Sequence, residues 1–192
     1  MKKAILTLMV SLIAILPTFG VTPGSVAVQD SFLGIRLGTV IRIDDVIKGI
    51  SGSGKGYFSH EYSDGGIHSI VFNNVFFAGH RWNYCDFVYS DDDVFYWFRV
   101  YDSMPEKTDT RETATKIFNI YKSKMDSKYG KVEIEGGQNS TSAIYKGNNR
   151  ITARVFNERS KTGGNFIDRF VGLEYIEMNT FSKLTQKEDN DL

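Results

Sequence analysis

One segment of the chain fits the spacing of a phosphate-binding loop. Gly49-Ile50-Ser51-Gly52-Ser53-Gly54-Lys55 matches G-x-x-x-x-G-K, in which backbone amides and a lysine hold phosphate groups. Gly56 follows the lysine, so the hydroxyl that would hold Mg²⁺ is missing. The surrounding pattern also places a helix before the loop and a strand after it, the reverse of the order that phosphate binding needs. We interpret the segment as a helix-to-strand loop and expect no cofactor.

The possible metal ligands are His60, Glu61, His68 and His80. A metal site needs three or four ligands that converge on one ion. If Asp64-Gly65 forms a two-residue hairpin loop, Glu61 and His68 face each other and His60 lies on the opposite side of the sheet. The histidines then diverge, and we predict no metal site.

A nucleophile is equally hard to assign. Cys85 is the single cysteine, which excludes an internal disulfide, and a catalytic thiolate would need a nearby base in an electropositive pocket. The neighbouring sequence supplies neither, and no Gly-x-Ser-x-Gly motif is present. We predict no catalytic residues and a protein that is not an enzyme. An enzyme without a recognisable motif is the alternative.

Aromatic residues are concentrated between residues 57 and 101, which hold 15 of the 26 Phe, Tyr and Trp residues and so suggest a specialised sheet. With Asp91-Asp92 as the loop of the last hairpin, one face has the composition of a core: Cys85, Phe87, Tyr89, Val94, Tyr96 and Phe98. The other face mixes flat rings with charges: Trp82, Tyr84, Asp86, Phe95, Trp97, Arg99 and Tyr101. This mixture suits recognition of a protein surface or a sugar. The predicted ligand-binding residues are Trp82, Tyr84, Trp97, Arg99 and Tyr101.

The competing interpretation is that both faces of this sheet are buried. A sheet covered on both sides is apolar on both, and the helices must bury their own apolar stripes somewhere. The grouping also depends on the turn, because a three-residue loop would change which side chains share a face.

Periodicity and turn residues predict an α+β protein. Helices are expected at about 40–50 and at 110–129, the second capped by Asp109 with Glu112. Strands are expected at 57–62, 67–72, 75–80, 81–89, 93–101, 131–135, 142–146, 151–157 and 171–178, with a bend near Gly79 that could join two of them. This order describes two similar units in tandem, at about 31–105 and 106–181. Each unit is a helix followed by an antiparallel sheet of mostly meander strands.

Four short stretches carry a resemblance to known proteins: Ser31-Phe32-Leu33-Gly34-Ile35, Gly38-Thr39, Phe77-Ala78-Gly79-His80-Arg81-Trp82 and Lys128-Tyr129-Gly130-Lys131. In these stretches the chain resembles small uncharacterised secreted proteins of gut anaerobes. Their layout is similar to the β-lactamase-inhibitor-protein-like fold, a tandem of helical segments on antiparallel sheet. The resemblance covers about residues 31–178. It implies a fold and a tendency to bind proteins, and no catalytic residues.

The two ends of the chain predict export and a loose tail. Lys2 and Lys3 precede an apolar run from Ala4 to Leu16, which is typical of a signal peptide and too short to span a bilayer. Small residues allow cleavage after Gly20 or after Ala27, so residues 1–27 are assigned to the signal. The single domain is expected over 28–181, and the polar residues 182–192 are expected to form a disordered tail.

Charge and location narrow the possible partners. Removal of the two lysines leaves 21 basic against 23 acidic residues, so we expect no nucleic-acid partner. Cys85 lies far from the new N-terminus, so we expect a secreted or periplasmic protein without a lipid anchor and without stable membrane insertion. The predicted function is a secreted binding module for a protein partner at the cell envelope. The alternative is carbohydrate binding on the aromatic face, and the oligomeric state stays open.

Overall fold

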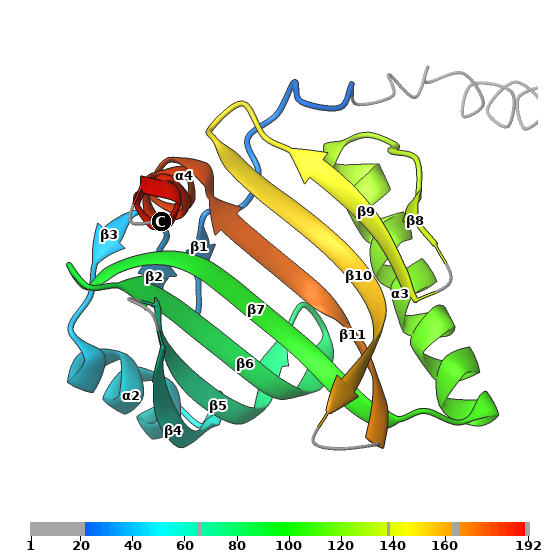
Figure 1. The fold of residues 1–192 in the computed structure, drawn as a ribbon, viewed down its shortest axis with the longest axis horizontal. Coiled ribbons are helices and arrows are strands. Elements are labelled where there is room, and N and C mark those ends of the chain that lie inside the picture. The colour runs from blue at the N-terminus through cyan, green and yellow to red at the C-terminus, as the bar shows by residue number, and fades with distance from the viewer. Residues whose placement is uncertain (1–21, 65–66, 138, 163–165, 191–192) are drawn as a thin grey trace, which may run out of the picture.

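A computed structural model of the chain describes residues 22–64, 67–137, 139–162 and 166–190. The predicted signal segment at 1–21 therefore lies outside the described residues. Figure 1 shows three helices, α2 (Ile43–Gly52), α3 (Thr108–Tyr129) and α4 (Met178–Asn190). The strands are β1 (Ser31–Phe32), β2 (Ile35–Arg36), β3 (Thr39–Val40), β4 (Tyr57–Asp64), β5 (Ile67–Phe77), β6 (His80–Ser90), β7 (Val94–Pro105), β8 (Glu135–Gly136), β9 (Ser140–Lys146), β10 (Ile151–Thr162) and β11 (Phe166–Glu177).

Nine of the strands form one antiparallel sheet, which confirms the α+β class. Its main path runs β4-β5-β6-β7-β11-β10-β9-β8, and β3 adds to β7. The chain therefore builds one meander from β4 to β7 and crosses to the far edge through α3. It then returns as a second meander, so that β11 pairs with β7 in the middle of the sheet.

Gly79 reverses the chain and does not join two strands into one. Ala78 and Gly79 have φ values of +54° and +83°, the left-handed conformation that a two-residue hairpin loop requires. The two strands expected at 67–72 and 75–80 are consequently one long strand, β5, and β6 starts at His80. The expectation of a bend inside a strand is wrong, because two successive left-handed residues close a turn.

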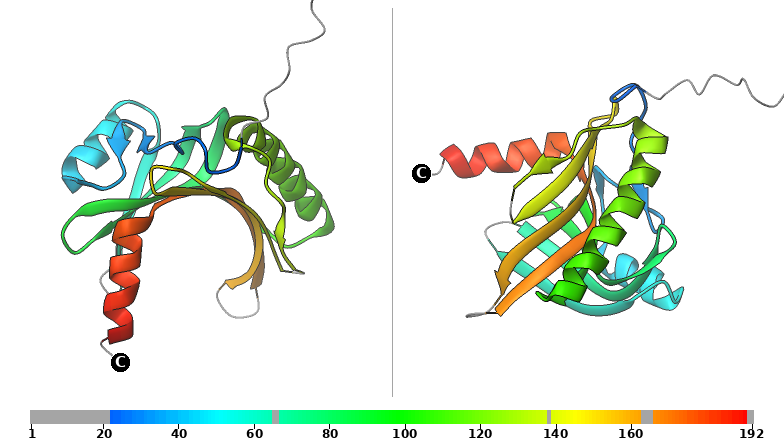
Figure 2. Two further views of the ribbon diagram at one scale, coloured as in Figure 1. Left: turned by 90° about the horizontal axis from the view of Figure 1, so that it is seen from above. Right: turned by 90° about the vertical axis from the view of Figure 1, so that its right-hand side faces the viewer.

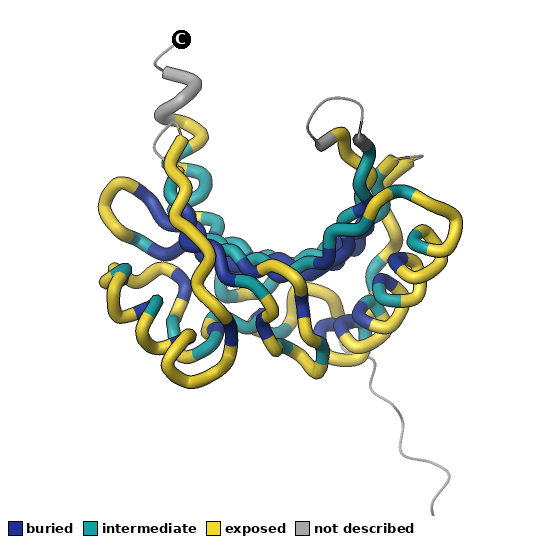
Figure 3. Tube along the Cα trace, turned by 90° about the horizontal axis from the view of Figure 1, so that it is seen from below, coloured by how far each residue is buried: buried dark blue, intermediate teal, exposed yellow. Residues whose placement is uncertain are grey.

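The sheet is strongly curved, with one covered face and one open face. Figure 2 shows α2, α3 and the N-terminal segment on the convex side of the sheet. Figure 3 shows the opposite, concave side as a trough, with α4 rising at one edge and the ends of β10 and β11 at the other. The concave side is therefore available to a ligand.

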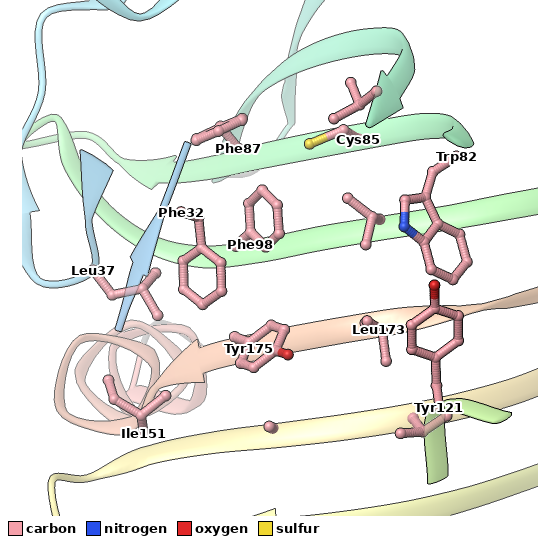
Figure 4. Packing of buried hydrophobic residues seen from close by; sticks show 14 of the residues in the cluster. Phe32, Leu37, Trp82, Cys85, Phe87, Phe98, Tyr121, Ile151, Leu173 and Tyr175 are labelled. Atoms are coloured by element: carbon pink, nitrogen blue, oxygen red, sulfur yellow. The ribbon is translucent and has the colours of Figure 1, made fainter. Parts of the chain in front are cut away.

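The core lies between the convex face and the helices. Figure 4 shows Phe32, Phe98 and Tyr175 packed together and, further along the sheet, Trp82 of β6 facing Tyr121 of α3. Phe32 is fully buried and its ring stacks on Phe98 with 4.3 Å between the ring centroids. The stripe predicted on α3 is buried here as expected, through Ala114, Phe118, Tyr121, Met125 and Tyr129. α2 and α3 thus use their apolar faces on the convex side, and on the concave side α4 stands at one edge of the sheet.

The start of α3 differs from the predicted capping. The helix begins at Thr108, which places Asp109 inside the first turn and not at the N-cap. The backbone N–H of Lys107, just before the helix, donates a hydrogen bond to the hydroxyl of Thr110 at 2.9 Å. Thr110 therefore provides the capping hydrogen bond at the start of α3 that the sequence pattern assigned to Asp109 and Glu112.

We expect Thr110→Val to lower the free energy of unfolding by about 1 kcal/mol, because it removes the hydroxyl and keeps the branched shape. Asp109→Ala is expected to cost about 0.5 kcal/mol, through the weaker interaction of its charge with the helix terminus. Urea unfolding of both variants measures the difference. A larger loss for Asp109→Ala would mean that the helix is capped as the sequence pattern suggested.

The C-terminal segment is helical, although the sequence predicts a disordered tail from residue 182. The carboxylate of Glu177 accepts hydrogen bonds from the backbone N–H groups of Asn179 and Thr180, at 3.0 and 2.8 Å. These contacts satisfy free donors at the start of α4, and Phe181 and Leu184 are half-buried. The polar composition of residues 182–192 predicts a tail, and composition does not show the cap that Glu177 provides. Within the described residues, no helix combines the length and apolar character needed to cross a membrane.

Candidate functional site

The concave face carries most of the side chains that the sequence groups together. Cross-strand pairs on β6 and β7 place Tyr84 opposite Tyr101, Asp86 opposite Arg99 and Val88 opposite Trp97. Residues of β4 and β5 continue this row toward the edge of the sheet. Together they line a hollow of about 280 Å³, called here the aromatic hollow: His60, Tyr62, Ile67, Ser69, Val71, Tyr84, Asp86, Val88, Trp97, Arg99 and Tyr101.

Trp82 does not belong to this face. It is fully buried in the core, where its ring lies 5.2 Å from that of Tyr121 and its indole N–H donates to the carbonyl of Phe77. Side chains of a regular strand alternate between the two faces of the sheet. In β5 and β6 this alternation is interrupted at Asn74, which has a φ of +60° and lies across from the segment between Trp82 and Tyr84. On the paired strand the backbone N–H of Asn83 bonds to the carboxylate of Asp102. A regular strand would have kept Trp82 beside Tyr84, and this irregularity turns it to the opposite side.

Phe95 also lies on the face opposite to the predicted one. The hairpin loop is Asp91-Asp92-Asp93, with Asp93 at a φ of +57°, and not the two-residue loop. Between Val88 and Tyr89 the register with β7 shifts by one residue, so that Tyr89 pairs with Phe95. This bulge puts Phe95 in the core. The sequence allowed either a two-residue or a three-residue loop here, and the three-residue loop is the one that forms.

Rings and guanidinium groups stack in a column across the middle of the sheet. The rings of Tyr84 and Tyr101 are 5.2 Å apart and nearly parallel. The guanidinium of Arg99 lies 4.6 Å from the ring centres of both Tyr101 and Phe156. Gly172 lies between Tyr101 and Phe156 in the register, and a Cβ there would overlap the backbone carbonyl oxygen of Val100 and come 2.9 Å from the Phe156 ring. A glycine is therefore required at this position of β11.

Buried polar atoms without a hydrogen-bond partner gather at this hollow. Among the described residues there are five such side-chain atoms, and four belong to residues that line the hollow: Ser69 Oγ, Asp86 Oδ1, Trp97 Nε1 and Arg99 Nε. The fifth belongs to Asn73, which is paired with Tyr84. Buried polar groups in proteins are normally paired, so these atoms can still form hydrogen bonds with water or with a ligand. They include both donors and acceptors.

The charges of the hollow are balanced by the neighbouring strands. The carboxylate of Glu174 accepts a hydrogen bond from Arg154 at 2.9 Å and lies 4.0 Å from Nε of Arg99. Burial raises the pKa of Asp86 to about 6, and the nearby charges of Arg99 and His60 only partly oppose this. Asp86 is thus a carboxyl group that changes charge close to neutral pH, at the floor of the hollow.

The other chemically capable residues lie apart from one another. His80 bonds to Asp102 at 2.8 Å, and His68 bonds to Asp91 at 2.9 Å. Across the described part of the chain no three His, Cys, Asp or Glu side chains are grouped so that they could hold a metal. Cys85 is fully buried in the core, where burial raises the pKa of its thiol well above the ordinary value.

The segment 49–55 is part helix and part loop. Its residues 49–52 form the end of α2, residues 53–55 form the loop, and β4 follows, starting at Tyr57. This is the helix-to-strand order that the sequence predicts.

The sequence did not reveal the contributions of β10 and β11 to the site. Gly172 and Glu174 come from β11, whose pairing with β7 joins residues more than 50 positions apart, and Phe156 comes from β10, which pairs with β11. The alternating pattern of β10 predicts only which of its residues share a face. Arg154, Phe156 and Glu158 do share one, and that signal was present but could not be connected to Arg99.

Comparison with known proteins gives no relative. No protein-family model matches the chain, and neither the curated proteins nor the solved structures contain a match to it.

Proposed function

We propose that this protein is a non-enzymatic binding module that holds a protein partner in the concave face of its sheet. The observation that carries the proposal is the group of unpaired buried polar atoms among aromatic rings in the aromatic hollow. Trp, Tyr and Arg are the residue types that contribute most to binding in protein interfaces. Here they surround a hollow that could receive one polar side chain of a partner, and the curved sheet supplies a wider surface around it.

The exposed aromatic residues near the hollow extend this surface. Tyr62 on β4 is 53% exposed and Tyr84 on β6 is 37% exposed, and both line the aromatic hollow together with the partly buried Trp97. An interface core with partly buried rings and an exposed aromatic and polar rim is the usual arrangement in protein recognition. The same surface carries the walls formed by α4 and by the ends of β10 and β11 (Figure 3).

We further propose that the two meanders are degenerate copies of one unit. α2 precedes the four strands β4–β7, and α3 precedes the four strands β8–β11. This order supports the tandem arrangement and the resemblance to the β-lactamase-inhibitor-protein-like fold. A protein-binding role for the joint sheet is consistent with that resemblance.

Work at the cell envelope requires export, and the N-terminal contacts favour one cleavage position. The carbonyl of Val26 accepts the backbone N–H of Asn148, and Val28 is buried, with its backbone N–H bonded to Asn149. Cleavage after Ala27 would remove the first contact and place a charged amine at Val28. We therefore expect the exported protein to start at Val21, as measured by intact mass. Retention of Met1 in exported material would contradict the signal peptide.

Site-directed photocrosslinking tests the proposal. A benzophenone side chain is placed at Tyr84 on the concave face or, as a control, at Ile120, which is 53% exposed on α3. Crosslinks to an envelope protein are expected from position 84 and not from position 120, and Trp97→Ala is expected to abolish them. Equal crosslinking from both positions, or crosslinks from 84 that survive Trp97→Ala, would contradict the proposal.

A carbohydrate ligand is the second candidate, and one observation favours it. The indole and guanidinium N–H donors of Trp97 and Arg99 and the acceptor of Asp86 lie unpaired beside flat rings, as in sites that stack and hydrogen-bond a sugar. A glycan would change the fluorescence of Trp97 on titration, whereas a protein partner would be captured in the absence of glycan. The two candidates are separated by this pair of measurements.

A further inference from the structure

A second hollow lies on the convex side of the sheet, where α3 begins. Its lining is polar and includes three arginines, Arg111 from α3, Arg159 from β10 and Arg169 from β11. The hollow measures about 430 Å³, and we call it the arginine pocket. Asn157, Arg159 and Arg169 belong to the face of the sheet opposite to Phe156 and Phe170, so the arginine pocket is separate from the aromatic hollow.

One carboxylate serves all three guanidinium groups. Arg169 donates to both oxygens of Glu106, at 2.7 and 2.8 Å, and its remaining terminal nitrogen donates to Asn157 at 2.9 Å. Glu106 and Arg169 therefore form a complete two-pronged ion pair, which fixes the carboxylate in place. The hydrogen bonds from Arg169 lower the pKa of Glu106, so it stays ionised at neutral pH.

The other two arginines share this carboxylate with Arg169. Arg111 approaches the same oxygen of Glu106 at 3.4 Å and Arg159 approaches it at 3.9 Å, so both guanidinium groups lie near one point. Both are well exposed to solvent, with side-chain exposures of 64% and 37%. None of the described residues lining the pocket is acidic. The pocket thus has an excess of two positive charges after its single carboxylate is paired.

We propose that the arginine pocket binds a phosphate or sulfate group, held between Arg111 and Arg159. Guanidinium groups match the oxygens of such anions through paired N–H donors, and two of them would neutralise a doubly charged group. The hydroxyl group of Thr141 lines the same pocket and offers a further donor, whereas that of Thr115 already donates to the carbonyl of Arg111 at 2.8 Å. The first turn of α3, which contains Arg111, adds the positive end of the helix dipole.

The same chemistry could come from a free ion or from an ester on a larger molecule. Titration of the full chain with inorganic phosphate, inorganic sulfate and methyl phosphate, in a Tris buffer of low ionic strength, separates these sources. Binding of methyl phosphate as well as inorganic phosphate assigns the pocket to an esterified group. Binding of the inorganic ions alone assigns it to the free ion, and both results support the site.

Variants locate the binding. Arg111→Gln and Arg159→Gln are each expected to raise the Kd for phosphate about tenfold or more, because each removes a charged hydrogen bond to the anion. Arg42→Gln is the control, since Arg42 is an exposed arginine beside one carboxylate, Asp45, and should leave the Kd within about twofold. Trp97→Ala should also leave it unchanged, which separates this proposal from the function of the concave face.

Two results would overturn the proposal. One is the absence of measurable binding of any of the three anions to the wild-type chain. The other is binding that Arg111→Gln and Arg159→Gln leave unchanged, or that Arg42→Gln weakens equally. Thermal unfolding of each variant, monitored by circular dichroism, confirms that the compared proteins are folded.

Discussion

Trp82→Ala is expected to lower the free energy of unfolding by about 3–5 kcal/mol, because it empties a large volume in the core. The side chain has no exposed surface and packs against His80 and Tyr121, with ring centroids 4.5 and 5.2 Å away. Its indole N–H also donates to the carbonyl of Phe77 at 3.0 Å, and that acceptor would lose its partner. Urea unfolding at constant pH measures the loss.

Trp97→Ala is the matched comparison, and it is expected to cost less than about 2 kcal/mol. Trp97 is partly exposed on the concave face, outside the core cluster, and its indole N–H has no partner to lose. Equal losses for the two variants would mean that Trp97 is packed as tightly as Trp82. The concave face would then be a second core and not a binding surface.

The pH dependence of stability is expected to carry a large contribution from Asp86. Burial raises the pKa of this carboxyl from an ordinary 3.8 to about 6 in the folded protein. Between these two values the folded chain holds the proton more tightly than the unfolded chain does. The free energy of unfolding therefore falls as the pH rises from about 4 to 6, by about 3 kcal/mol for a shift of two pKa units. Below pH 4 this contribution is fully present.

Asp86→Asn isolates that contribution from the rest of the chain. Other carboxyls act in the opposite direction, since the hydrogen bonds from Arg169 lower the pKa of Glu106 and make it stabilising as the pH rises. The quantity to compare is therefore the difference between wild type and Asp86→Asn at each pH. The wild type should lose stability relative to the variant between pH 4 and 6. A difference that does not change with pH would show that Asp86 is hydrated in the folded protein.

The local pattern of the chain predicted two of the helices and most strands of the large sheet, but neither α4 nor the irregularities of the strands. The helix at 108–129 follows from its apolar stripe, and the concave grouping of Tyr84, Trp97, Arg99 and Tyr101 follows from strand alternation. Trp82 and Phe95 were placed on the wrong face because alternation assumes regular strands. A left-handed asparagine and a one-residue bulge reverse it, and neither has a distinctive sequence signature.

The parts of the site that come from distant strands could not be predicted. Phe156 and Glu174 meet Arg99 only because β11 pairs with β7 in the centre of the sheet. This pairing depends on the path of α3 across the convex face, which no local pattern encodes. In contrast, the cap that Glu177 provides for α4 is local, and the polar composition of the tail concealed it.

The most direct test of the concave face as a binding surface uses the two tryptophans as reporters. In the full chain labelled with 5-fluorotryptophan, Trp82 and Trp97 each give one ¹⁹F NMR signal, which the Trp97→Phe variant assigns. We expect the Trp97 signal to respond to solvent D₂O in the free protein and to shift when the crosslinked partner or a glycan is added. The Trp82 signal should do neither, because its ring is fully buried. A Trp97 signal that is insensitive both to solvent and to every ligand that binds would contradict the account.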